Sequence, residues 1–185
     1  MTWVFYWYMA ATYNWAQTTG SSGAPTTTDL GSSGNLMNFQ NADSSTPANY
    51  STNVITASDA VNGGNSYELW FRGHWTGTFS TITNLKFWQS AAFSPSTGLT
   101  LRYACTATYA TPTANTTNIS TGQTNTATCP TATPGGNNIG IANNLSGTLS
   151  AAGYSDYIVL QLHVATTAAA GDTSLATFTL QYDET

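Results

Sequence analysis

The sequence predicts an all-β protein, an antiparallel β-sandwich of jelly-roll type. Apolar and polar residues alternate in four runs, at 67–75, 99–110, 157–165 and 174–182, and this period of two is typical of strands. The segments between them are rich in Thr, Asn, Ser and Gly, which favour turns over helices. A chain of 185 residues is long enough to bury a core of its own. We therefore expect about eight strands in two packed sheets.

The closing segment predicts two strands joined as a hairpin. Residues 157–165 are apolar on most of both faces, as in a strand at the centre of a sheet. Residues 174–182 alternate more strictly. The pair Gly171 and Asp172 between them favours a turn, so we expect the two runs to pair with each other. The apolar face of the second run carries Phe178, Leu180 and Tyr182.

Irregular features are expected elsewhere. Alternation breaks near Thr83 within a strand at 79–90, which predicts a bulge, and residues 138–149 predict a further short strand. Two long polar stretches are expected to form surface loops, at 18–66 and 111–138. Within the first, short strands are expected at 36–40 and 53–56.

The amino-terminal residues 1–19 predict an aromatic strand or arm, followed by a single sandwich domain at 20–185. Apolar and aromatic side chains fall on both faces of this segment, and the Gly/Ser/Thr-rich residues after it would act as a flexible linker. Trp and Tyr are enriched in binding hot spots. One interpretation is an arm that binds a neighbouring subunit, and the other is a buried first strand. The expected interface residues are Trp3, Phe5, Trp7 and Trp15.

The charge pattern excludes several partners. Only 6% of residues are charged, against about 25% in ordinary domains. The net charge is −5, and the three basic residues Arg72, Lys86 and Arg102 are scattered. Nucleic acids and anionic membranes need clustered Lys and Arg, so we expect neither as a partner. A surface of hydroxyls and amides is insensitive to salt, which suits an extracellular medium.

The first residues of the sequence do not predict a secretory signal. The apolar run WVFYWYMAA has no Lys or Arg before it, unlike a secretory signal. No run approaches the ~20 apolar residues of a membrane span. An extracellular type of composition without an export signal favours a virion component released by lysis. A cleaved signal replaced by an initiating Met would explain it as well.

Few residues suggest chemistry. Cys105 precedes the second polar stretch and Cys129 lies within it, and a disulfide between them would stabilise the fold by about 3 kcal/mol, although spacing alone leaves the bond open. His74 and His163 lie on other strands, so we expect no zinc site, no cofactor and no catalytic residue. Three acidic residues would meet only at the end of the predicted hairpin, where a solvated acidic cluster is favoured over a Ca²⁺ site. They are Asp156, Asp183 and Glu184.

Three tryptophans offer an alternative function. Trp70, Trp75 and Trp88 would form a glycan-stacking platform if their rings were exposed on one face. Strand aromatics are more often part of a core, which is the other interpretation of the same residues.

The overall pattern resembles a family of viral proteins. A β-sandwich with an aromatic arm and Thr/Asn/Gly-rich loops is similar to virion surface proteins of tailed bacterial or archaeal viruses. The closing DYIVLQLHVATTAAAGDTSLATFTLQYDE resembles terminal hairpins of capsid decoration and accessory head proteins. The resemblance implies a structural protein on the virion surface, without catalytic residues. Its partners would be a major capsid protein or identical subunits, in a homo-oligomer and most simply a trimer. The alternatives are a carbohydrate-binding module, viral or secreted, and a subunit of an extracellular filament or tube.

Overall fold

The computed structural model describes residues 10–32, 39–44, 55, 64–94, 96–114, 128–169 and 175–185. All regular structure in these ranges is β, and the pairings are antiparallel, which confirms the predicted class. The eight strands are β1 (Thr12–Thr19), β2 (Thr26–Gly31), β3 (Leu69–Thr76), β4 (Ile82–Ala91), β5 (Leu99–Thr106), β6 (Gly153–Tyr154), β7 (Tyr157–Val164) and β8 (Thr177–Glu184).

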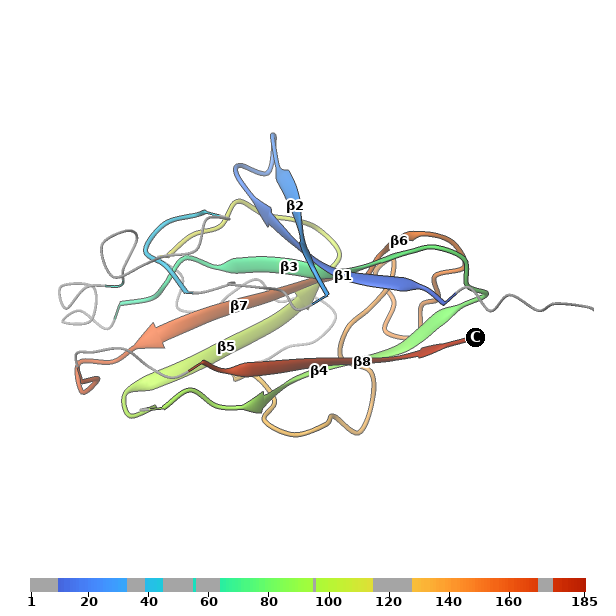
Figure 1. Ribbon diagram of the computed structural model, residues 1–185. Helices are drawn as coiled ribbons and strands as arrows, with labels where there is room; N and C mark the ends of the chain where they lie inside the picture. Colours follow the sequence, from blue (N-terminus) through green and yellow to red (C-terminus); the bar gives the residue numbers. More distant parts are fainter. Residues whose placement is uncertain are drawn as a thin grey trace, which may run out of the picture.

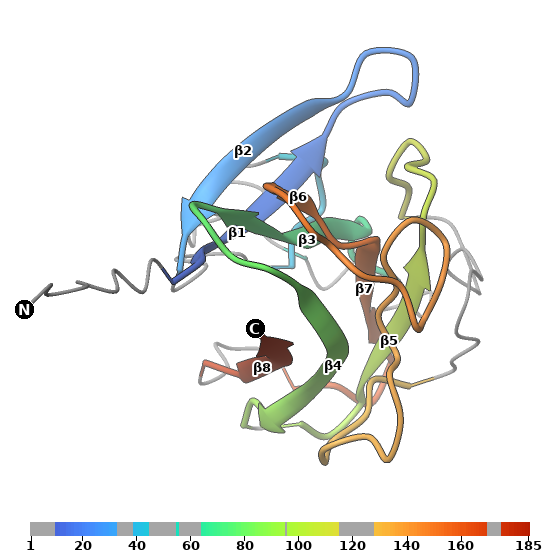
Figure 2. The same ribbon diagram turned by 90° about the vertical axis from the view of Figure 1, so that its right-hand side faces the viewer.

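The strands form two sheets around one core. The larger sheet has the order β2-β1-β3-β7-β5, with β6 beside β3, and the smaller pairs β4 with β8. In both ribbon views β4 and β8 lie below β1 and β3 (Figures 1 and 2). Rings from the two sheets meet between them: Phe87 of β4 lies 6.2 Å from Trp15 and 5.7 Å from Phe71, between centroids. The arrangement is sandwich-like, and the jelly-roll type stays a prediction.

Strand β7 is central, as its two apolar faces predicted. Ile158 and Leu160 point into the core between the sheets. Tyr157 and Val159 point to the other side, where they form a second cluster with Trp70 and with Ala104 of β5. The predicted hairpin is wrong, because β7 pairs with β3 and β5 whereas β8 pairs with β4. A strand that is apolar on both faces fits the centre of a sheet that is covered on both sides, whereas the single apolar face of β8 covers the core from the opposite sheet.

The predicted bulge in β4 is confirmed. The register with β8 shifts between Thr83 and Lys86, and Asn84 at the shift has a φ of 57°. Asn tolerates this left-handed conformation better than most residues do. The bulge places Ile82 and Leu85 on the same buried face.

The predicted linker after β1 is instead a hairpin. Thr19 of β1 pairs with Thr26 of β2, and Gly20, with a φ of 94°, begins the turn. The proposed boundary at residue 19 therefore falls inside a hairpin, and residues 12–19 belong to the larger sheet. Gly, Ser and Pro are typical of linkers and of tight turns alike, so composition alone did not separate the two.

One edge of β4 is covered by irregular chain, which we call the covering segment, residues 128–149. Its backbone bonds to both sheets: Cys129 N–H donates to Leu101 O of β5 (2.9 Å), and Gln89 N–H of β4 donates to Pro130 O (2.8 Å). The strand predicted at 138–149 does not form, because the chain curls through left-handed residues at Ala142 and Asn143. Of the strands predicted at 36–40 and 53–56, only residues 39, 40 and 55 lie within the described ranges.

Candidate functional site

The outer edge of β8, which we call the open edge, is the strongest candidate for an interaction site. In the described part of the chain β8 pairs with β4 alone, over its whole length. Proteins normally protect such an edge with Lys, Pro or a bulge. Strand β8 (TFTLQYDE) contains no Lys and no Pro, and its only charged residues are the last two, Asp183 and Glu184. The backbone groups of this edge are therefore suited to pairing with another strand.

The apolar face of β8 is only partly buried. Phe178, Leu180 and Tyr182 pack against the core between the sheets, yet each keeps some exposed surface. Leu175, two residues before the strand, is 93% exposed. A partner along the open edge would cover this apolar surface as well as the backbone.

The outer edges of β5 and β2 differ from the open edge, as does the covered edge of β4. At the outer edge of β5, Leu101 O accepts a hydrogen bond from Cys129 N–H. Strand β2 is six residues long and exposed over most of its length, so a strand added beside it would bury little apolar surface. Among the strands that the structure describes, only β8 combines an unpaired edge with a half-buried aromatic row.

A polar hollow of about 320 Å³ lies on the outer face of the small sheet. Lys86 and Gln181 are paired across β4 and β8, and both line the hollow. Asn84 Nδ2 donates to Asp183 Oδ2 (2.6 Å), and this bond fixes one wall. Amides, an ammonium group and a carboxylate suit a hydroxylated ligand. The full lining is Asn84, Lys86, Gly135, Gly136, Asn137, Gln181 and Asp183.

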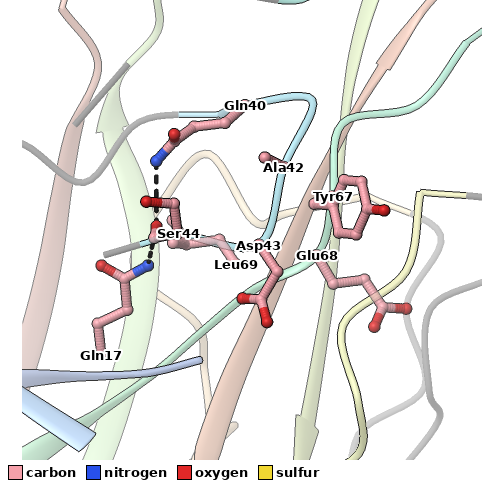
Figure 3. A pocket seen from close by; sticks show the side chains of 8 residues that line it. All are labelled: Gln17, Gln40, Ala42, Asp43, Ser44, Tyr67, Glu68 and Leu69. Atoms are coloured by element: carbon pink, nitrogen blue, oxygen red, sulfur yellow. Dashed lines mark hydrogen bonds between the residues drawn. The ribbon is translucent and has the colours of Figure 1, made fainter. Parts of the chain in front are cut away.

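A second depression, near β1, is filled by its own hydrogen bonds (Figure 3). The Nε2 groups of Gln17 and Gln40 both donate to Ser44 O, each at 3.1 Å. Asp43 Oδ2 accepts from Gly20 N–H (2.7 Å) while burial raises the pKa of its carboxyl. The remaining space, about 10 Å³, is enough for one water molecule. These contacts hold residues 39–44 against β1 and leave no room for a ligand.

The predicted tryptophans are mostly core residues. Trp70 and Trp75 are 0% exposed, so neither can present a ring to a glycan. The two faces of β3 are both covered, which the alternation of β3 alone did not reveal: Trp75 faces the core and Trp70 the second cluster. Trp88 is half-buried and, two residues after Lys86, shares the outer face of β4 with it. A three-ring platform is therefore not present.

The predicted interface residues divide into two groups. Trp15 is 7% exposed and packs edge-on against Phe71, with 5.3 Å between ring centroids, so its ring belongs to the core of its own domain. The other three, Trp3, Phe5 and Trp7, lie outside the described residues.

The cysteines form no disulfide. Cys105 and Cys129 are both buried in the core between the sheets. Burial raises the pKa of each thiol to about 12, and for Cys105 a hydrogen bond from the backbone of Gly140 partly opposes the shift. At neutral pH both stay protonated and act as small apolar side chains.

The histidines make structural contacts. His74 Nδ1 lies 3.2 Å from both carboxylate oxygens of Asp29, and its ring stacks on Tyr154 with 4.1 Å between centroids. His163 Nδ1 lies 3.0 Å from Asn65 Oδ1, and burial together with Arg102 lowers the pKa of the imidazole.

The three acidic residues do not share one cluster. Asp156 accepts hydrogen bonds from Asn143 N–H, at 3.0 and 3.3 Å, and Glu184 Oε1 accepts one from Ala11 N–H at 2.7 Å. Asp183 is bound to Asn84. In the described ranges no group of three or more His, Cys, Asp or Glu residues is placed to hold a metal ion.

No family model, no curated protein and no solved structure matches this chain. Among the described residues no helix has the length and hydrophobicity needed to span a bilayer.

The open edge and the polar hollow were both missed from sequence. The signal for the open edge was present in residues 174–182, whose strict alternation marks one apolar and one polar face. The predicted hairpin paired this run with residues 157–165, whereas among the described residues it pairs with β4 and its other edge stays open. The hollow is built from three separate segments, and no local pattern marks it.

Proposed function

We propose that this protein is a structural subunit of an extracellular assembly, a decoration protein that binds the capsid lattice on the surface of a virion. The observation that carries the proposal is the open edge of β8, with its half-buried aromatic row and the exposed Leu175 beside it. Edge pairing satisfies backbone groups and joins chains without charged contacts. Backbone pairing of this kind suits a chain in which only 6% of residues are charged.

The connections between strands favour a jelly-roll type of sandwich. The chain passes to the small sheet after β3, returns for β5, and passes again after β7, while β7 lies between β3 and β5. This crossing between sheets is typical of Greek-key and jelly-roll proteins, which are common in viral capsids. The jelly-roll form, an aromatic amino-terminal arm and a homo-oligomer, most simply a trimer, belong to the same proposal. The partner is the major capsid protein, identical subunits, or both.

The test is the composition of native particles. Particles from the source culture are purified on a density gradient, and this chain and the main shell protein are quantified by mass spectrometry. A decoration protein should occur at a fixed ratio across gradient fractions and preparations. A trace amount that varies between preparations, or none, would exclude decoration. Filaments or tubes of this chain in electron micrographs would replace it with the filament alternative.

The polar hollow supports a second candidate, a carbohydrate-binding module. Its amide and charged side chains lie on the same outer face as Trp88, whose half-exposed ring would stack on a sugar. Glycan-array binding that disappears on Trp88→Ala and weakens on Gln181→Ala would support this function. Thr100→Ala, at an exposed position on β5, is the control that should bind as the unaltered chain does.

A further inference from the structure

We propose that the open edge of β8 receives residues 2–9 of a second copy of this chain as an added strand. The inference rests on the proposed assembly function and names the partner of the open edge. It predicts that subunits join to each other without any contact with a shell.

The segment begins close to the open edge. Ala11 N–H donates to Glu184 Oε1 at 2.7 Å, so the chain reaches residue 10 beside the carboxyl end of β8. Residues 2–9 (TWVFYWYM) are eight in number, as many as the residues of β8, and extended they span about 26 Å. An arm of this length matches the full strand.

The direction of β1 favours a second copy over the same chain. The Tyr13 ring lies 5.9 Å from Tyr182, and the Trp15 ring lies 6.2 Å from Phe87, which pairs with Leu180. Strand β1 therefore runs opposite to β8, and a straight continuation before Thr12 passes beyond the end of β8 and not back along it.

Pairing with its own β8 would require a reversal at Ala10 and Ala11. Alanine is not among the residues that favour tight turns. The arm of a neighbouring copy reaches the open edge without reversal and can pair antiparallel, as the described strands do.

The chemistry of the two strands is complementary. Residues 2–9 carry no charge and no Pro or Gly, and β8 is uncharged until Asp183. With Trp3, Phe5 and Trp7 on the inner face, their rings continue the row of Phe178, Leu180 and Tyr182. The intervening residues of the arm then share the outer face with Thr177, Thr179 and Gln181. The added strand covers the half-buried aromatic row and extends the small sheet.

Each copy donates one arm and accepts one. Successive head-to-tail contacts close into a ring if the rotation between copies allows it, and a ring of three gives the expected trimer.

The test uses cross-chain disulfides. One copy carries Val4→Cys, Tyr6→Cys or Tyr8→Cys, the other copy carries Thr179→Cys, and one of them has a size tag. The two are co-expressed, oxidised and separated on a non-reducing gel. Residues opposite each other in a ladder are close enough for a disulfide, so we expect a mixed dimer band with at least one arm position. The native thiols are buried with pKa values of about 12, so the unaltered chain should give no band.

A matched control places the acceptor cysteine elsewhere. Thr100→Cys is exposed on β5 and should not cross-link to any arm position. Two outcomes would overturn the proposal. The first is a disulfide only within one chain, when both cysteines are present in it, and the second is no disulfide in any combination.

These results are separate from the particle test. A mixed dimer without particle association would support self-assembly and exclude decoration. A fixed particle ratio without a mixed dimer would support decoration and exclude the exchange of arms.

Discussion

The two long edges of the small sheet are treated differently. The outer edge of β4 is covered by the chain itself, over residues 128–149. Asn138 even substitutes for a strand residue: its Oδ1 accepts from Phe87 N–H and its Nδ2 donates to Phe87 O, both at 2.8 Å. Ile82 and Leu149 exchange a further pair of backbone hydrogen bonds.

The outer edge of β8 has no comparable cover among the described residues. Because the outer edge of β4 is hydrogen-bonded to the covering segment, an open edge is not a general property of this sheet. The contrast motivates the proposal that the open edge of β8 binds a partner. The predictions below test the contrast, from the largest expected effect to the smallest.

The largest effect is expected from a core ring beside the covered edge. Phe87 is 0% exposed and stacks on Phe178, with 5.6 Å between centroids. Phe87→Ala should lower the free energy of unfolding by about 3–5 kcal/mol, because it leaves a cavity in the core. Phe178→Ala, beside the open edge, should cost about half as much, since its ring is only partly buried. Urea denaturation measures both, and equal losses would contradict the contrast.

The next effect concerns the covering segment. Asn138→Ala removes two buried hydrogen bonds and leaves the N–H and C=O of Phe87 without them, so we expect a loss of about 2–4 kcal/mol. Asn137→Ala is the neighbouring control: its side chain bonds to Leu145 O in a partly buried setting and should cost under about 1.5 kcal/mol. Similar losses for the two variants would show that the segment does not hold β4.

A pH effect is expected from the buried thiols. The pKa of Cys105 and of Cys129 is raised from 9.0 to about 12 by burial, so the unfolded state loses these protons first. Their contribution to stability is complete below pH 9 and is lost as the pH rises from 9 towards 12. Urea midpoints at several pH values should therefore fall less steeply above pH 9 in the double variant Cys105→Ala, Cys129→Ala. An identical slope would contradict the burial of the thiols.

The smallest effect on the isolated subunit is expected at the open edge. Leu175 is 93% exposed, so Leu175→Ser should change the free energy of unfolding by less than about 0.5 kcal/mol. The same change should weaken self-association measured by light scattering, because the leucine lies beside the partner strand. A loss of stability without any change in association would assign Leu175 to folding alone.

The sequence predicted strands better than their partners. Alternation located β3, β5, β7 and β8, and its break at Thr83 located the bulge. Successive side chains of a strand point to opposite faces, so a strand with one buried face shows apolar residues at every second position. Period two does not say which strand lies alongside, so β7 and β8 were paired with each other wrongly.

Covered and uncovered faces were also hard to separate. The face of β3 with Trp70 is buried by Tyr157 and Tyr109, which come from distant parts of the chain. Trp15 looked like an arm residue because apolar side chains on both faces fit a central strand and an interface strand equally well. The candidate site depends on an edge, and an edge is a property of the whole sheet.

The most direct test is amide hydrogen exchange along β8. Alternate amides of this strand point away from β4, and the account predicts that they are protected in the full chain at assembling concentrations. In a chain without residues 2–9 they should exchange rapidly, while the amides that β4 directs to the covering segment stay slow in both proteins. Rapid exchange of the outward β8 amides in the full chain at every concentration would contradict the account.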